Sequence, residues 1–407
     1  MKVLELPRFG RRVRAMQPRP IAVFAATSGH SGVDRLMTNL VLQWVAWGLP
    51  VDLLQVRGHG PHIAAPSPGL RLVDLQARHV LSAFPAVVRY LRRERPQAML
   101  CDKDRVNRIA ILARRMTRAD TRLAVRLGTT LSRNLESRGR PERWLQTQSV
   151  RRLYPLADRV LVPSFGVADD LTAHTGIDRR HVVVVRSPIV TQALLDQAAL
   201  AADHPWLLEH TLPVILGVGE LGYRKDFATL IRAFARVRAS RPCRLIILGR
   251  GRRRDALLAL ASELGVAGDL DLPGFTPNPY AFMAQADLFV LSSRWEGMPV
   301  VLIEALACHT PVVATDCPSG PREVLAGRPV GELVAVGDDA AMAAAMVRML
   351  GRVPPASAFE EAVEEYRAER SAAAYLEAIG VELPAAVTLR RPFTGESQLR
   401  ARELRRQ

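Results

Sequence analysis

The sequence predicts an α/β protein with two doubly wound domains of parallel strands that face each other across a cleft. Short apolar runs alternate with amphipathic helical patterns along most of the 407 residues, which is typical of βα units around a parallel sheet. Several apolar runs are nearly continuous, as expected for strands that helices cover on both faces. The alternation breaks once, near residues 191–213, and a second α/β series then begins. The chain is also too long for one ordinary domain.

The first series occupies residues 20–190 and follows a basic N-terminal arm at residues 1–19. Its amphipathic stretches predict helices at residues 33–47, 84–94 and 106–118. Its apolar runs predict strands at residues 21–27, 51–56, 70–75, 98–101, 123–127, 160–163 and 182–185. We therefore expect a complete N-terminal domain in this part of the chain.

The second series follows an interdomain linker at residues 191–212 and occupies residues 213–357. Its strands are predicted at residues 214–218, 244–248, 270–272, 288–292 and 312–315. Its helices are predicted at residues 227–239, 253–264, 280–285, 299–308 and 340–350. A further helix at about 358–380 is expected to pack back on the first domain, and residues 381–407 are expected to form a basic tail.

The formal net charge of +16 is the strongest compositional signal. It fits nucleic acid, an anionic membrane surface or a phosphorylated substrate, with solubility alone as the plain alternative. The arginines are spread along the chain without an aromatic-interleaved RNA motif or a zinc finger, so we expect no nucleic-acid partner. The sequence has no run of about 18 apolar residues and no apolar signal segment, which predicts a cytoplasmic protein, with peripheral contact at the inner face of the membrane as an option.

The four cysteines are scattered, without a CxxC pair or a neighbouring histidine cluster. Their spacing suits no common zinc site. The nine histidines also lack the spacing of metal ligands. We therefore expect neither a metal ion nor a cofactor.

Residues 292–305 carry the most informative motif, because they follow an apolar strand and open a helix. Pro299 suits a first helical turn, Gly297 permits close approach of a ligand, and the amides near Met298 offer an anion site at the helix start. Glu296 and Glu304 flank this site, and eight residues of helix cover about 12 Å. The two carboxylates are thus placed to contact a hexose and a ribose at opposite ends of one ligand; a capping glutamate and a surface glutamate are the alternative interpretation.

Two more glycine loops follow strands in the same half of the chain. One contains Gly219 with Arg224 and Lys225, whose charges suit a diphosphate, and the other contains Gly249 and Gly251. Each loop is weak evidence alone, because such turns recur throughout α/β folds. Three of them in one domain, with basic residues and two glutamates, favour a nucleotide-diphosphate ligand.

The stretch from residue 218 to residue 325 closely resembles the retaining glycosyltransferases of family four, which have the GT-B fold. The matching segments are KDFATLIRAFARVR at 225–238, LIILGRG at 245–251, PGFTPNPYAFMAQADLFVLSSRWEGMPVVLIEALA at 273–307 and PVVATDCPSGPREVL at 311–325. Weaker similarity includes SGHSGVDRLMTNL at 28–40 and ADRVLVPSFGVADDL at 157–171. The resemblance implies two Rossmann-like domains that move a sugar from a nucleotide sugar, with UDP favoured, to a glycan or lipid-linked acceptor of polysaccharide or lipopolysaccharide synthesis. It also implies retention of configuration without a divalent metal.

The resemblance implies roles for individual residues of the donor site. Glu296 lies against the donor sugar and Lys225 binds the diphosphate, so both are predicted as catalytic. Glu304 holds the ribose. The further donor contacts are predicted at Arg224, Gly297, Met298, Pro299, Gly219, Phe275, Thr276 and Gly32.

The acceptor side is less clearly marked in the sequence. Gly29 lies in the N-terminal glycine loop that approaches the acceptor in the family. Lys103 and Arg105 follow a predicted strand, so they are placed to face the cleft, with solvated loop charges as the favoured alternative. Arg126 follows another strand, where many relatives carry a histidine near the donor sugar.

Two departures from the family pattern concern the reaction centre. Glu220 stands where an arginine commonly pairs with the diphosphate, and the segment 126–130 has no histidine. These departures motivate an alternative function, a catalytically silent protein that binds nucleotide sugars on the same fold.

Overall fold

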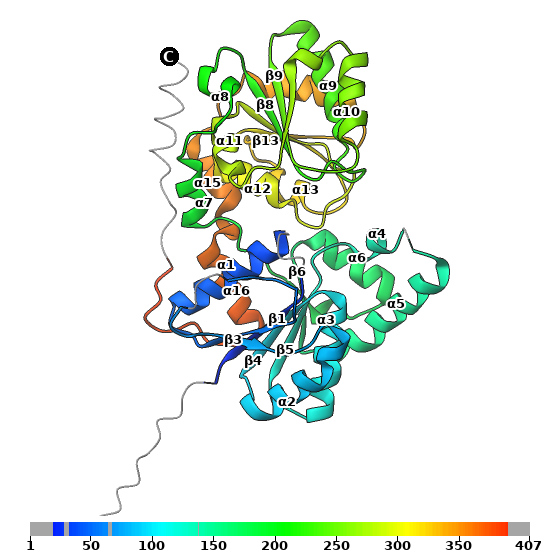
Figure 1. Cartoon of the computed structure of the whole chain (residues 1–407), viewed down its shortest axis with the longest axis vertical. Coiled ribbons are helices and arrows are strands. Elements are labelled where there is room, and N and C mark those ends of the chain that lie inside the picture. The colour runs from blue at the N-terminus through cyan, green and yellow to red at the C-terminus, as the bar shows by residue number, and fades with distance from the viewer. Residues whose placement is uncertain (1–18, 28–31, 64–66, 137, 390–407) are drawn as a thin grey trace, which may run out of the picture.

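The computed structural model describes residues 19–27, 32–63, 67–136 and 138–389. It contains two α/β units stacked along the long axis of the molecule (Figure 1). Each unit is a parallel β-sheet covered by helices on both faces. The expected fold class, two doubly wound domains, is therefore confirmed.

The first sheet has seven parallel strands in the order β3-β2-β1-β4-β5-β6-β7. The strands are β1 Ile21–Ala25, β2 Val51–Gln55, β3 Leu70–Asp74, β4 Ala98–Asp102, β5 Arg122–Arg126, β6 Arg159–Val162 and β7 Val182–Val184. The helices are α1 Gly32–Ala46, α2 Phe84–Glu94, α3 Asp104–Thr117, α4 Leu131–Glu136, α5 Arg140–Leu153 and α6 Phe165–Thr175. Every residue of β1 is buried, because successive side chains enter the cores on opposite faces of the sheet.

The second sheet has six parallel strands in the order β10-β9-β8-β11-β12-β13. The strands are β8 Val214–Val218, β9 Arg244–Leu248, β10 Leu270–Gly274, β11 Leu288–Leu291, β12 Val312–Thr315 and β13 Gly331–Val334. The helices are α9 Phe227–Ser240, α10 Arg254–Glu263, α11 Pro279–Gln285, α12 Val300–Ala307, α13 Pro321–Leu325 and α14 Asp339–Leu350. The strand order reverses between β8 and β11, and ligands of doubly wound sheets bind at the carboxyl ends of the strands at such a switch point.

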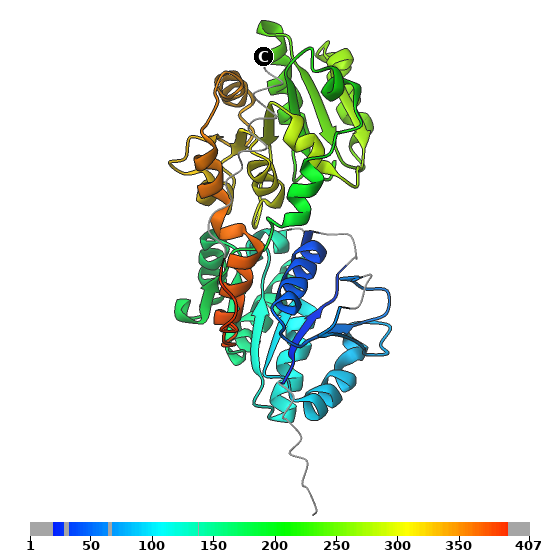
Figure 2. The ribbon, with the colours of Figure 1, turned by 90° about the vertical axis from the view of Figure 1, so that its left-hand side faces the viewer.

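Four more helices connect the two units. Helices α7 Gln192–Ala198 and α8 Pro205–Glu209 lie in the segment between the sheets, and α15 Ala356–Val363 and α16 Ala368–Ala378 follow the second unit. Figure 2 shows α15 and α16, in orange to red, descending along the side of the molecule from the upper unit to the lower one. Trp44 of α1 donates its indole N–H to the carbonyl of Ala372 in α16 at 3.1 Å, so the end of the described chain is part of the first unit's core.

The structure differs from the sequence prediction where apolar patterning is weak. Helix α5 is polar around most of its circumference, and strand β13 has the sequence GELV with only its last residue buried, so neither was predicted. The helix expected at about 358–380 is two helices separated by a 3₁₀ turn at Glu364–Tyr366. Pro299, expected in the first helical turn, is the N-cap residue of α12. In the described part of the chain, no helix combines the length and the apolar character that crossing a bilayer requires.

Candidate functional site

Two loops meet at the switch point of the second sheet. The loop after β8 carries Arg224 and Lys225, and the loop after the neighbouring strand β11 carries Ser293 and Glu296. The ammonium of Lys225 lies 2.8 Å from Oε1 of Glu296, and Nη1 of Arg224 lies 2.8 Å from Oε2. The hydroxyl of Ser293 donates a further hydrogen bond to Oε1 at 2.8 Å. Both carboxylate oxygens of Glu296 are therefore held by donors.

The electrostatics of Glu296 are those of a buried but fully compensated charge. Its exposed fraction is 4% and that of Lys225 is 7%. Burial alone would raise the pKa of Glu296, but the positive charges of Lys225 and Arg224 and the hydrogen bonds hold that pKa below its ordinary value. The side chain is thus a carboxylate at neutral pH, able to accept hydrogen bonds.

Backbone contacts fix the two loops relative to each other. The hydroxyl of Ser292 donates to the carbonyl of Lys225 at 2.7 Å, and the amide of Arg294 donates to the carbonyl of Arg224 at 2.8 Å. The guanidinium of Arg294 also pairs with Asp226 at 2.8 Å. Because the polar groups that hold the loops come from neighbouring strands, the Glu296 cluster is built into the sheet edge.

Close approach explains two of the glycines in this region. A Cβ at Gly219 would lie 2.8 Å from Cε of Lys225, and a Cβ at Gly249 would lie 1.8 Å from the carbonyl oxygen of Gly219. Side chains at these positions would displace Lys225 or push the β8 and β9 loops apart. Glu220, which directly follows Gly219, is exposed, and its carboxylate lies against Gly222.

Glu304 lies in α12 and meets the opposite unit. Its Oε1 lies 3.3 Å from Nη1 of Arg35 in α1 and accepts a hydrogen bond from the hydroxyl of Tyr280 at 3.3 Å. Its Oε2 is buried and has no hydrogen-bond partner among the described residues. Burial raises the pKa of Glu304, against the opposing effect of Arg35, and burial raises the pKa of Tyr280 to about 12. The free carboxylate oxygen is therefore available to a ligand that donates hydrogen bonds.

A cavity of about 260 Å³ lies beside Glu304. It opens between α1, the segment before α7, and the start of α11. Its walls bring Gly32 and Glu304, two of the predicted donor contacts, into one space. The polar lining consists of Arg35, Asn39, Thr191, Gln197, Tyr280 and Glu304.

Gly297 is the point at which the loop after β11 touches the first unit. A Cβ at this position would lie 2.5 Å from the carbonyl oxygen of Gly128. The carbonyl of Gly297 accepts hydrogen bonds from the hydroxyls of Ser164 at 3.0 Å and Ser319 at 2.8 Å. Only a residue without a side chain fits between the loops of the two units.

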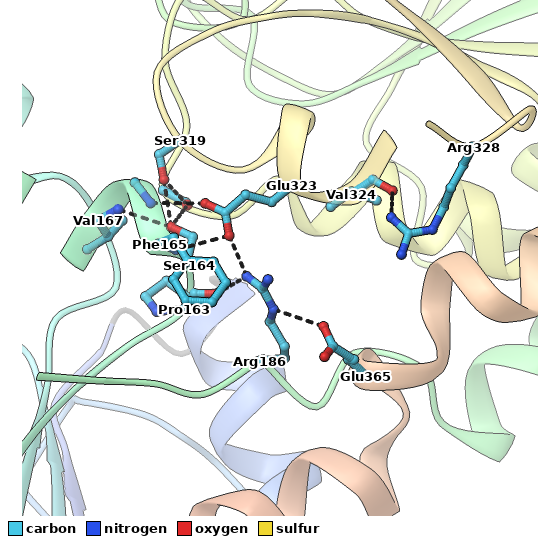
Figure 3. Close-up of polar contacts among 12 residues, drawn as sticks. Pro163, Ser164, Phe165, Val167, Arg186, Ser319, Glu323, Val324, Arg328 and Glu365 are labelled. Atoms are coloured by element: carbon cyan, nitrogen blue, oxygen red, sulfur yellow. Dashed lines mark hydrogen bonds and ion pairs between the residues drawn. The ribbon is translucent and has the colours of Figure 1, made fainter. Parts of the chain in front are cut away.

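A polar network next to Gly297 joins the two units (Figure 3). Glu323, in α13, accepts hydrogen bonds from the amides of Phe165 and Gly166 at the start of α6, each at 3.0 Å. Arg186 pairs with Glu323 at 2.7 Å and with Glu365 at 3.3 Å. A carboxylate of the second unit thus complements the positive end of a helix in the first unit.

The remaining predicted donor contacts lie along the same edge of the second sheet. Met298 and Pro299 are buried at the start of α12. Phe275 follows β10 and is 65% exposed, with the guanidinium of Arg250 at 5.6 Å from its ring centroid. Thr276 accepts a hydrogen bond from the amide of Asn278 through its hydroxyl. Phe275 and Arg250 thus form an exposed aromatic and cationic surface beside the glycine loops, whereas Met298 and Pro299 are covered.

The predicted acceptor residues have different surroundings. Lys103 and Arg105 are exposed at the junction of β4 and α3. Arg126 is 3% exposed and its guanidinium contacts Asp102 at 2.8 Å, the hydroxyl of Tyr375 at 2.9 Å and Ser187 at 3.2 Å. These contacts tie α16 to the sheet through the buried guanidinium, and the role of Arg126 as an acceptor contact stays a prediction. Gly29 lies outside the described residues.

Several residues that complete the site carry no sequence signal of their own. Arg35, Tyr280, Arg186 and Glu323 act across the contact between the units, and nothing in their local patterns indicates a partner more than 100 residues away. Among the described residues, no three His, Cys, Asp or Glu side chains gather as candidate metal ligands. The four cysteines are buried and free.

The fold and the site define a two-unit α/β protein with a polar cavity between the units. Residues 212–352 match a family model described as glycosyl transferases group 1, and residues 31–188 match a glycosyl transferase 4-like domain. The chain belongs to this family of glycosyltransferases, and its fold is GT-B.

Curated relatives act in bacterial glycan synthesis according to their names. One is the N-acetylgalactosamine-N,N'-diacetylbacillosaminyl-diphospho-undecaprenol 4-alpha-N-acetylgalactosaminyltransferase of Campylobacter jejuni, 35% identical over 251 residues that make up 61% of this chain and 65% of the relative. Another is the lipopolysaccharide core biosynthesis glycosyltransferase LpsE of Rhizobium meliloti, 36% identical over 34% of this chain and 39% of the relative. The matches thus span less than two thirds of the length of these relatives.

Solved structures show the same fold at low sequence identity. The apo form of the lipopolysaccharide outer core galactosyltransferase WaaB superposes with a TM-score of 0.68 and 19% identity, over 89% of this chain and 99% of that one. HepE of Anabaena in complex with UDP superposes with a TM-score of 0.67 and 15% identity, over the same shares.

Proposed function

We propose that this chain is a retaining glycosyltransferase that moves a sugar from a UDP-sugar to a glycan or lipid-linked acceptor of a cell-surface polysaccharide or lipopolysaccharide. The observation that carries the proposal is the buried cluster of Glu296 with Lys225 and Arg224 at the switch point of the second sheet. The names of the Campylobacter jejuni and Rhizobium meliloti relatives support the acceptor class. The UDP bound to HepE supports the base.

The donor diphosphate is assigned to Lys225, Arg224 and the amides at the start of α12. Glu296 forms ion pairs with both cations, and its single negative charge leaves this cluster with a net charge of +1. A diphosphate provides an alternative counterion for them, which leaves the carboxylate of Glu296 free to accept hydrogen bonds from hydroxyls of the donor sugar. When the donor binds, the ion pairs of Glu296 with Lys225 and Arg224 are therefore replaced. The two cations then contact the pyrophosphate, and Glu296 contacts the sugar.

The nucleoside is assigned to the cavity beside Glu304. Oε2 of this residue lacks a partner in the described structure and accepts the ribose hydroxyls. Phe275 is exposed with Arg250 over its ring, which provides a stacking surface for the base next to Thr276. Uracil is thus bound mainly through its face and through backbone groups.

In the transfer, the bond between the anomeric carbon and the leaving phosphate oxygen breaks. The acceptor oxygen bonds to the same face of the sugar, and its proton passes to the departing UDP. Lys225 and Arg224 stabilise the negative charge that develops on the diphosphate. Because these cations and the helix amides supply positive charge, we expect transfer without a divalent metal.

The test is a binding and turnover assay on matched variants. Glu296→Gln preserves shape and should abolish sugar transfer while it retains UDP binding and the melting temperature within a few degrees. The control is Glu263→Gln, an exposed position on α10. Wild-type turnover under Glu296→Gln would refute the assigned role. Binding of UDP-sugar without transfer to any acceptor would instead favour the silent binding protein that Glu220 motivates.

A further inference from the structure

Two aromatic side chains flank the Glu296 cluster without belonging to it. Tyr223 directly precedes Arg224, and Trp295 directly precedes Glu296. The two ring centroids lie 6.0 Å apart, and the ring planes are tilted by 52°, so the rings do not cover each other face to face. Tyr223 is 59% exposed. Aromatic rings contribute most to binding when a partner covers them, so this exposed pair is a candidate ligand contact.

A buried ion pair fixes the position of the Tyr223 ring. The guanidinium of Arg294 lies 4.5 Å from the centroid of this ring, and its Nη2 pairs with Asp226 at 2.8 Å. Asp226 is 2% exposed, and Nε of Arg294 is buried without a hydrogen-bond partner among the described residues. The cation therefore backs one face of the ring, and the opposite face is left to a ligand.

The two rings lie between the edge of the second sheet and the first unit. The loops after β8 and β11 run side by side, and the amide of Arg294 donates a hydrogen bond to the carbonyl of Arg224 at 2.8 Å. Tyr223 and Trp295 are the next residues of the two loops beyond this contact. Two residues after Trp295, Gly297 meets the first unit. The pair Tyr223 and Trp295, the aromatic platform, thus borders the space between the units.

The stereochemistry of the proposed reaction determines which ligand reaches the aromatic platform. In a transfer with retention, the acceptor oxygen attacks the face of the sugar from which the diphosphate leaves. The attacking hydroxyl therefore lies next to the leaving phosphate oxygen, which is assigned to Arg224 and Lys225. Tyr223 is the neighbour of these cations along the chain. The group that carries the attacking hydroxyl is thus the group placed over the aromatic platform.

We propose that the aromatic platform binds the terminal pyranose of the acceptor. A pyranose presents C–H groups on its apolar face, and the electron-rich face of an aromatic ring attracts these slightly positive groups. The inference rests on the proposed function and narrows it, because the acceptor then ends in a sugar ring and not in a lipid diphosphate alone. The second unit contributes to the choice of acceptor as well as to donor binding.

Two other occupants fit the aromatic platform less well. A nucleobase also stacks on aromatic rings, but the nucleoside is assigned to Glu304 and Phe275, away from the diphosphate. A free phosphate group requires an available positive charge, whereas Arg294 already pairs with the carboxylate of Asp226. A neutral sugar ring matches both the open aromatic face and the compensated charge behind it.

The experiment measures binding of the methyl pyranosides of glucose, galactose, N-acetylglucosamine and N-acetylgalactosamine to the full chain by saturation-transfer NMR, with and without UDP. Sorbitol is the comparison ligand, because it has hydroxyls but no ring face. The variants are Tyr223→Ala, Tyr223→Phe and Trp295→Ala. The control is Trp144→Ala, because Trp144 is 61% exposed on α5, outside the site. Calorimetry measures UDP binding to every variant.

We expect at least one pyranoside to bind and sorbitol not to bind. The Kd of the pyranoside should rise about three- to tenfold in Tyr223→Ala and in Trp295→Ala. Tyr223→Phe keeps the ring and should bind as the wild type does, as should Trp144→Ala, and UDP affinity should be unchanged throughout.

Three results would overturn the proposal. The first is a wild-type chain that binds no pyranoside or binds sorbitol equally well. The second is equal pyranoside binding by the wild type and both alanine variants of the aromatic platform, which would place the sugar at Glu296. The third is a loss of UDP binding together with pyranoside binding in Tyr223→Ala, because Tyr223 would then only support the diphosphate loop. A wild-type chain that binds no UDP, but binds a pyranoside that Tyr223→Ala does not, would count against the proposed function alone.

Discussion

Arg35 of the first unit lies 3.3 Å from Oε1 of Glu304 in the second, and it also donates a hydrogen bond to the hydroxyl of Tyr280 at 2.7 Å. Tyr280 in turn donates to the same carboxylate oxygen. One oxygen of Glu304 is thus held by both units, while the other has no partner in the described structure. The orientation of the proposed ribose contact therefore depends on how the two units are placed.

Replacing Arg35 should weaken donor binding more than it slows transfer. In Arg35→Ala the carboxylate of Glu304 loses its positive neighbour, and we expect the donor KM to rise about 5- to 20-fold with little change in kcat, as for a modest coupling between sites. Arg35→Lys should restore part of the affinity. Calorimetry with UDP and steady-state kinetics measure the effect, and Arg57→Ala, an exposed position, is the control. An unchanged KM would show that Arg35 does not support the donor site.

The two glutamates should give opposite pH dependence of stability. The pKa of Glu296 is below its ordinary value of 4.5 in the folded chain, so its contribution is fully present above about pH 4.5 and is lost as the pH falls through the lowered value. The pKa of Glu304 is raised, so its contribution is present at low pH and is lost as the pH rises through the raised value.

Thermal unfolding of Glu296→Gln and Glu304→Gln between about pH 3 and pH 7 tests these signs. Relative to the wild type, the Glu296 variant should become less stable as the pH rises. The Glu304 variant should become more stable relative to the wild type over the same rise. The same slope for both variants would contradict the assigned electrostatics.

The parts of the fold that follow from local pattern were predicted from the sequence, and the contacts between distant segments were not. Strands such as β8 are continuous apolar runs with turns at both ends, so their positions are readable without knowledge of the fold. Lys225 and Glu296 are 71 residues apart, but both follow strands, and the carboxyl ends of parallel strands share one edge. No such rule predicts the partners of Arg35 and Glu323, because those partners are set by the packing of one unit on the other.

Helix α5 shows a different limit of sequence analysis. Helix prediction relies on an apolar stripe that faces a core. In α5 Val150 is buried, whereas Trp144 and Leu145 lie on the outer side. The apolar residues therefore do not follow one stripe, and the segment appears irregular in sequence although it forms a continuous helix.

A side chain at Gly297 should impair transfer by separating the units. In Gly297→Ala the new Cβ would meet the carbonyl oxygen of Gly128 at 2.5 Å, so the loop after β11 must shift relative to the first unit. A displacement of about 1 Å at a reaction centre costs about 100-fold in rate. The kcat of purified protein measures this loss, and UDP binding should persist. Gly268→Ala is the matched control, because a Cβ there meets nothing within 4 Å; a normal kcat in Gly297→Ala would mean that the loop contact is dispensable.

Glu323 should hold the two units in the arrangement that transfer requires. Its carboxylate accepts from two amides of α6 and pairs with Arg186, so Glu323→Gln removes the charge from a partly buried ion pair and from the positive end of a helix. We expect a larger radius of gyration in small-angle scattering and about a tenfold lower transfer rate. Both follow because Glu323 favours the arrangement of the two units that transfer requires over a more open one. Arg186→Gln should produce the same change, and the double variant should add little, because the two residues act through one contact.

Glu361→Gln, with a side chain 75% exposed, is the control. An unchanged radius with an unchanged rate would show that the network in Figure 3 is a surface contact without effect on closure.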